Sequence, residues 1–156
     1  MLTETEKSGS TIRRATLALG VFQILFGCLI GFIPPSAVEW FRGIVMAHIE
    51  FTANGVLMVV LGLLVNEMHL AATTLKVWFV SLQIGTWTNG AAGLAAAFLG
   101  SSSELMPTIN QRFPPPHGTD SAVVSGLLSI CGVAIILALF LTLYGLLCRK
   151  ASPDRG

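Results

Sequence analysis

The chain has 156 residues, of which 53% are hydrophobic and 11% are charged, against about 25% charged residues in an ordinary soluble domain. This composition indicates a protein embedded in a membrane. The formal net charge is +1 and lysines and arginines form no run, so the electrostatic surface that nucleic-acid binding needs is missing and we expect no nucleic-acid partner. The polar N-terminal segment mixes acids and bases, which is unlike a cleavable signal peptide.

Four apolar runs are long enough to cross a bilayer core of about 30 Å as helices of about 20 residues. They are residues 15–33, 43–65, 77–99 and 122–148, and Pro34 and Pro35 end the first. Little polar sequence remains between them. We therefore predict an all-α integral membrane protein, a four-helix bundle that forms a single membrane domain over residues 1–156.

The distribution of basic residues predicts the orientation of this bundle, because cytoplasmic loops carry an excess of lysine and arginine. Four crossings put both termini on one side. That side holds most of the basic residues: Lys7, Arg13, Arg14, Lys76, Arg149, Lys150 and Arg155. The other side holds Arg42 and Arg112. We expect both termini in the cytoplasm of a bacterium, the protein in its inner membrane, and the loop at residues 101–121 outside as an irregular cap.

Small residues at four-residue spacing predict that the helices approach one another closely. They are Gly27 and Gly31, Thr86 and Gly90, Asn89, Gly93 and Ala97, and Ser125 and Ser129. Four helices enclose little interior, so a homo-oligomer would help to bury a polar site.

The second apolar run contains the most informative polar residues: His48, Glu50 and Asn54. Each costs several kcal/mol in hydrocarbon unless it is paired or hydrated, so together they indicate a functional site. At about 1.5 Å per residue, His48 and Glu50 lie about 8 to 11 Å inside the outer helix end and Asn54 about 16 Å inside. Asn89 of the third run arrives at about 15 Å from the same side, so we expect it at the level of Asn54, with Trp87 just beneath.

The helical period places these groups on two faces of one helix. Four residues share the face of His48: Thr52, Gly55, Val59 and Gly62. Glu50 and Asn54 point roughly 120° to 160° away from His48. A monomer of four helices could hardly bury both faces, which is a second reason to expect an oligomer.

The sequence lacks the motifs of hydrolases, zinc proteases and nucleotide-binding proteins. A single histidine inside a membrane can hold haem b through one axial bond and leave the sixth iron position open, and glycine-lined helix faces give room for a flat macrocycle. His69 and His117 lie in opposite loops and are poorer ligands. Two non-enzymatic alternatives remain at this point: an electron carrier, which normally needs two axial ligands, and a small-solute transporter or assembly subunit without a cofactor.

Several motifs resemble the hydroxylaminobenzene mutases, small integral membrane proteins of nitroarene degradation. They are His48-x-Glu50-x-x-x-Asn54-Gly55, Gly85-Thr86-Trp87-Thr88-Asn89 and Ala95-Ala96-Ala97-Phe98, followed by a loop with Pro107. The same framework is similar to the styrene oxide isomerases, four-helix trimeric membrane enzymes that use ferric haem b as a Lewis acid. The resemblance covers about residues 15–148.

The resemblance implies a role for each of the candidate residues. His48 would be the single axial ligand and metal-binding residue, with Thr52 and Gly55 on the same face as further cofactor-binding candidates. Asn54 would position a small aromatic substrate. Glu50, Asn89 and Trp87 are the other catalytic candidates, and the assembly would be a homotrimer.

Two positions favour the mutase over the epoxide isomerase. An acidic and a phenolic residue that the isomerases use correspond here to Gly85 and Gly93, whereas Glu50 suits the mutase pattern. We therefore expect an isomerase that converts hydroxylaminobenzene to 2-aminophenol by intramolecular hydroxyl transfer. A styrene oxide isomerase-like epoxide rearrangement is the alternative, and a non-catalytic membrane haem or small-solute carrier is a further one.

Overall fold

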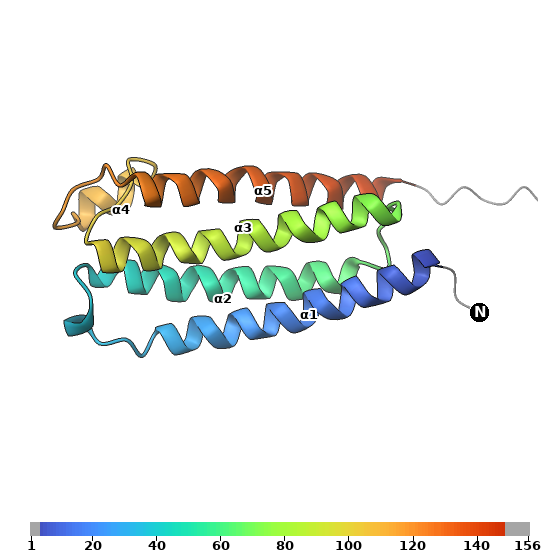
Figure 1. Cartoon of the computed structure of the whole chain (residues 1–156), viewed down its shortest axis with the longest axis horizontal. Coiled ribbons are helices and arrows are strands. Elements are labelled where there is room, and N and C mark those ends of the chain that lie inside the picture. The colour runs from blue at the N-terminus through green and yellow to red at the C-terminus, as the bar shows by residue number, and fades with distance from the viewer. Residues whose placement is uncertain (1–3, 149–156) are drawn as a thin grey trace, which may run out of the picture.

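The computed structural model describes the backbone of residues 4–148 and the side chains of residues 9–148. This part of the chain is all-helical, as predicted, and four long helices run side by side along the molecule (Figure 1). The long helices are α1 (Glu4–Ile30), α2 (Phe41–Leu64), α3 (Ala72–Leu99) and α5 (Ala122–Leu147). The connections hold the short helix α4 (Pro107–Arg112) and the 3-10 turn η1 (Pro35–Ala37).

Three of the described helices are long and apolar enough to cross a membrane: Gly9–Ile30 within α1, Phe41–Leu64 and Ala122–Leu147. They agree with the expected integral membrane protein. The third predicted crossing, α3, falls short of the same hydropathy because it carries residues such as Lys76, Gln83 and Asn89. A crossing by α3 therefore stays a prediction.

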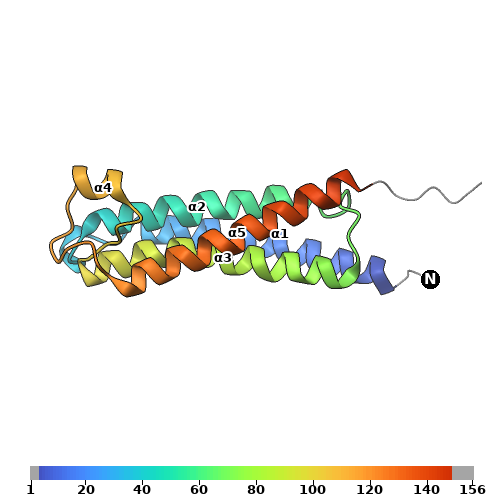
Figure 2. The same cartoon turned by 90° about the horizontal axis from the view of Figure 1, so that it is seen from above.

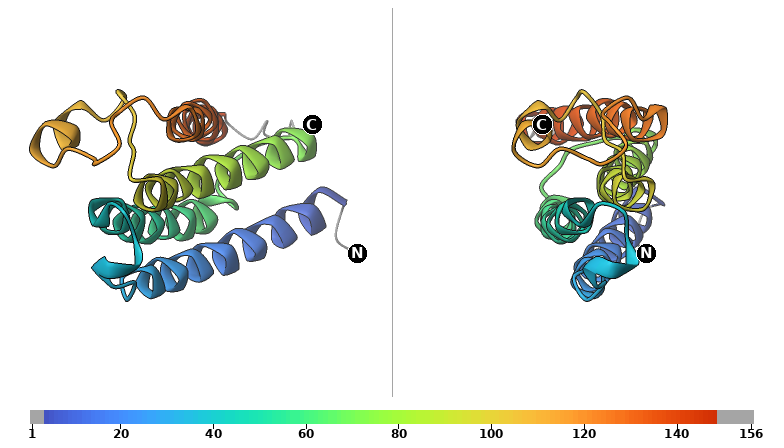
Figure 3. Two further views of the ribbon diagram at one scale, coloured as in Figure 1. Left: turned by 60° about the vertical axis from the view of Figure 1, so that its left-hand side comes forward. Right: turned by 90° about the vertical axis from the view of Figure 1, so that its left-hand side faces the viewer.

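The long helices follow one another around an open arc, which is seen end-on in Figure 3. α1 packs on α2, α2 packs on α3, and α3 packs on α5, with a smaller contact between α1 and α3. α3 therefore touches each of the other three long helices, so its polar side chains can face protein rather than lipid. The start of α1 and the end of α5 lie at the same end of the molecule, and α4 lies at the other end (Figures 1 and 2).

The helices differ most from the apolar runs at three of their ends. α1 begins at Glu4 rather than at residue 15 and ends at Ile30 rather than at residue 33. α3 begins at Ala72 rather than at residue 77. Hydropathy predicts where lipid surrounds a helix, whereas backbone hydrogen bonds continue into polar residues such as Glu and Lys, which are good helix formers.

Local signals explain the other helix ends. Gly100 closes α3 in the left-handed conformation (φ 63°), which favours glycine. The side chain of Ser121 caps α5 by accepting a hydrogen bond from the Val124 amide at 3.4 Å. The loop at residues 101–121 packs on the end of the molecule, where α4 covers an apolar cluster and Arg42 stacks 3.5 Å from the Phe113 ring centroid.

Small residues bring the helix backbones together as predicted. A Cβ atom added at Gly20 would lie 2.9 Å from the Gly55 carbonyl oxygen, and one at Gly93 would lie 2.8 Å from the Ala47 amide nitrogen. On α5, Ser125 hydrogen-bonds Ser103 of the loop at 2.8 Å, and the exposed Ser129 donates to its own helix.

Candidate functional site

The two polar faces of α2 are confirmed, and the face of His48 is covered by α1. Gly20 packs on Gly55 and Val59, Gly27 packs on Thr52, and Gly31 packs on His48. Gly62 completes the stripe against Leu17. The helical period alone fixes this stripe, which is why the sequence could predict it.

His48 is held from one side and open on the other. Its Nδ1–H donates to the carbonyl oxygen of Gly27 at 2.8 Å, because a carbonyl can only accept. In the tautomer protonated at Nδ1, the lone pair is on Nε2. A cavity of about 390 Å³ beside the ring opens to the surface of the molecule. Its lining is mostly apolar: Cys28, Gly31, Phe32, Phe41, Ile44, Val45 and His48.

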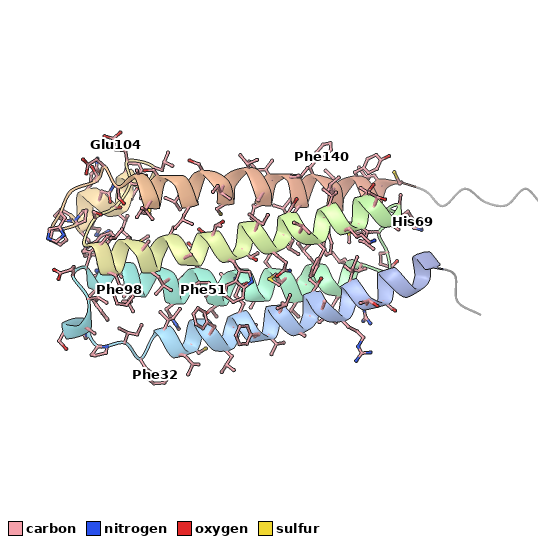
Figure 4. All side chains as sticks on the ribbon, viewed as in Figure 1. Phe32, Phe51, His69, Phe98, Glu104 and Phe140 are labelled. Carbon is pink, nitrogen blue, oxygen red and sulfur yellow. The ribbon has the colours of Figure 1, made fainter. Side chains whose placement is uncertain are left out.

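These residues fit a haem held by one axial ligand. Nε2 supplies the donor atom, the cavity walls are apolar, and the missing side chain of Gly31 keeps space beside the ring. The described residues hold no cluster of three or more His, Cys, Asp or Glu side chains that could bind a bare metal ion. Of the other histidines, His69 lies in the turn between α2 and α3 (Figure 4) and His117 bonds Leu99 at the opposite end of the molecule. Neither lies at the level of His48.

Thr52 and Gly55 contact α1 rather than this cavity. The hydroxyl of Thr52 donates to the His48 carbonyl oxygen at 2.7 Å, within the helix. Gly55 is buried, and a Cβ atom there would lie 2.6 Å from the Gly20 carbonyl oxygen. Their positions support a role in packing α1 onto α2, beneath the ligand, instead of direct contact with a cofactor.

The opposite face of α2 carries a carboxylate held by α3. The Asn89 side-chain amide donates to the Glu50 carboxylate. This hydrogen bond joins α2 to α3 on the side of α2 away from the His48 cavity.

Cys131 on α5 was not among the predicted site residues. Cys131 belongs to the stripe that α5 turns toward α3, because Val124 and Ala138 on the same stripe are buried and Ile135 packs on Gly85. Which helix faces that stripe cannot be deduced from one helix alone.

Asn54 does not share a level with Asn89. Asn54 is buried and its amide donates to the Thr86 carbonyl oxygen at 3.4 Å, whereas Asn89 reaches Glu50. The prediction was wrong by about one turn. It aligned the two helices by the ends of their apolar runs, but the contact of Gly43 with Ala97 sets the actual register.

Trp87 lies on the α1 side of α3, apart from the Glu50–Asn89 pair. Its ring centroid is 6.0 Å from Phe22, 5.9 Å from Phe26 and 5.6 Å from Phe51. Phe51, labelled in Figure 4, lies inside the molecule and packs on Gly90. The arrangement supplies an aromatic cluster between α1, α2 and α3 at this depth.

Two glutamine side chains have buried amide groups. Gln23 on α1 has no exposed surface, and neither its amide nitrogen nor its amide oxygen has a partner among the described residues. The amide nitrogen and oxygen of Gln83 on α3 are also buried and have no partner among the described residues. A polar side chain within an apolar run was the available signal for both.

Comparisons with known proteins bear on the family of the chain. The chain is 27% identical to the hydroxylaminobenzene mutase HabB of Ectopseudomonas oleovorans over 155 residues, which cover 99% of this chain and 92% of that protein. No solved structure matches the chain significantly. The family model of styrene oxide isomerase matches residues 12–147. Because that match takes in nearly all of the described helices, the resemblance predicted from the motifs is confirmed, and the chain belongs to the styrene oxide isomerase family.

Proposed function

We propose that the protein is a haem-dependent membrane isomerase that converts an aryl hydroxylamine, such as hydroxylaminobenzene, to 2-aminophenol. The similarity to a hydroxylaminobenzene mutase over nearly the whole chain supports the reaction. The observation that carries the proposal is His48, whose Nδ1 is engaged by Gly27 and whose Nε2 is left for a ligand bond beside an apolar cavity.

The reaction is an intramolecular hydroxyl transfer without net redox change. The N–O bond breaks, a C–O bond forms at the ring carbon next to the nitrogen-bearing carbon, and the proton on that carbon is lost as the amine gains one. A haem bound through His48 would supply a Lewis acid for the weakening of the N–O bond, help worth several kcal/mol.

The chain supplies the proton transfer and the environment. The Glu50 carboxylate can accept the ring proton and return it to nitrogen, and Asn89 holds that carboxylate in place. The buried amide of Asn54 is a further group for orienting substrate. Apolar helices keep bulk water away, which favours return of the oxygen to the ring over its loss, and they suit a small aromatic substrate that partitions into lipid.

We infer that the working unit is a homotrimer. His48 and Glu50 lie on opposite faces of α2, so one protomer does not bring both to one substrate. The cavity beside His48 is open, and the α2–α3–α5 face of a neighbouring copy would close it and present a Glu50 carboxylate to it. We further propose that α3 crosses the inner membrane of a bacterium as a fourth span, with both termini in the cytoplasm.

The test uses the full chain purified in mild detergent. We expect a Soret absorption band and conversion of hydroxylaminobenzene to 2-aminophenol, with His48→Ala losing both. Full turnover by a protein without a Soret band would contradict the haem, and a His48→Ala variant that keeps both would contradict the ligand.

The family match favours one second candidate, isomerisation of styrene oxide. It is measured on the same preparation. A kcat/KM for styrene oxide above that for hydroxylaminobenzene would make the epoxide the better substrate. A haem-loaded protein that leaves both compounds unchanged would contradict an isomerase.

A further inference from the structure

The last turn of α1 ends beside the His48 ring, and its carbonyl groups have an unusual hydrogen-bond pattern. The Gly31 amide is shared between the Gly27 carbonyl at 3.3 Å and the Cys28 carbonyl at 3.2 Å, and both bonds are long. The shorter bond to the Gly27 carbonyl, at 2.8 Å, comes from His48 Nδ1. The Gly27 carbonyl therefore accepts from the imidazole in addition to the longer bond from its own helix.

At the end of the helix, the Gly27 carbonyl oxygen lies in a more negative electrostatic potential than a carbonyl oxygen in the middle of a helix. The last carbonyls of a helix carry about half a negative charge in sum. Surroundings of low dielectric constant strengthen a hydrogen bond made there. A ligand histidine that donates its second N–H to such an acceptor binds a metal more strongly and in one tautomer.

Gly31 keeps this geometry sterically possible. A Cβ atom at position 31 would lie 3.1 Å from His48 Nδ1 and 3.5 Å from its Cε1. The first of these distances is shorter than most contacts that real Cβ atoms make. The added Cβ atom would also lie 3.2 Å from the Cys28 carbonyl oxygen. A side chain there forces the ring or the turn to move by a few tenths of an ångström, which weakens the hydrogen bond.

We propose that the C-terminal turn of α1, through the Gly27 carbonyl and the bare position at Gly31, is the positioning device of the haem ligand and sets the iron in its ferric state. The proposal rests on the proposed function. A ligand polarised in this way donates more charge to iron and lowers its reduction potential. The ferric ion carries the higher charge and is the stronger Lewis acid. In this proposal Gly27 and Gly31 act through His48 and do not touch substrate.

The first test needs no haem. In full-length protein freed of haem and labelled with ¹⁵N-histidine, we expect the His48 signals of an imidazole protonated at Nδ1 and bare at Nε2. Loss of the signals in His48→Gln identifies them. The opposite tautomer would overturn the proposal, whatever reaction the protein catalyses.

The second test measures the haem itself. In the full-length protein, Nδ1-methylhistidine at position 48 keeps Nε2 and removes the donated hydrogen, and we expect the reduction potential to move to more positive values. Gly31→Ala should weaken haem binding by about 10- to 100-fold, the usual effect of losing such support. The matched control is Gly132→Ala, where an added Cβ atom meets nothing within 4 Å.

The outcomes separate this inference from the proposed function. A wild-type protein that binds haem through His48, but whose potential and affinity are the same in the methylhistidine and Gly31→Ala proteins, overturns the inference and leaves the isomerase standing. A wild-type protein that binds no haem overturns both.

Discussion

The Glu50 side chain places an acid inside an apolar helix, and its energy depends on one partner. The Asn89 amide donates to it from α3. An ionised carboxylate without a donor would cost several kcal/mol at this depth. A substitution that removes the charge of Glu50 and a substitution that removes Asn89 should therefore affect the protein differently.

Glu50→Gln should lower kcat by about 10²- to 10⁴-fold, the usual contribution of a general acid–base group. The Soret band should stay unchanged, because His48 lies on the other face of α2. Steady-state kinetics and absorption spectra on one preparation measure both. A normal kcat would leave the carboxylate a structural role. Thr88→Ala is the control, since the Thr88 hydroxyl bonds only its own helix.

At the scale of the helices, register decides which predicted residues meet. The stripe from His48 to Gly62 on α2 could be predicted because it depends on one helix only. The meeting of Asn89 with Glu50 rather than with Asn54 could not, because Gly43 and Ala97 set the offset of two helices.

The partners of Trp87 could not be predicted from the sequence either. Trp87 and Asn89 are two residues apart, yet one packs on α1 and the other reaches α2. The all-helical fold and the ligand candidate follow from hydropathy and residue type. The partners of each side chain follow from packing between helices, which one sequence does not contain.

The α2–α3 contact can be tested at Gly93. Gly93→Ala should lower the free energy of unfolding by about 1–3 kcal/mol, because its Cβ atom would meet the Ala47 backbone. Gly132→Ala on α5 adds the same atom into open space and should be neutral or slightly stabilising, since Ala is the better helix former. Thermal unfolding in detergent compares the two. Equal free energies of unfolding for the two variants would show that α2 and α3 can move apart at Gly93 at little cost.

At the scale of the whole molecule, the separation of His48 from Glu50 demands more than one copy if both serve one substrate. The His48 cavity lies beside α1 and α2, while the Glu50 carboxylate lies on the side of α3. Closed rings of identical chains put such different faces in contact.

Co-expression of His48→Ala with Glu50→Gln tests this arrangement. Each variant alone should be inactive, whereas trimers that contain both variants should recover about a third of wild-type activity, because only one of the three sites receives an intact His48 and an intact Glu50 from neighbouring copies. Two different affinity tags isolate the mixed oligomers and show that they form. Mixed oligomers that form without any recovery would place the whole site within one protomer.

The central place of α3 has a consequence for biogenesis. It is the long helix that falls short of membrane-spanning hydropathy, and it is also the one that touches all the other long helices. A segment of this kind partitions poorly into lipid by itself, so its entry from the translocon relies on neighbours that are already present or still to emerge. Synthesis of α5, which packs along α3 and is the most apolar of the candidate spans, would then complete insertion of the segment that precedes it.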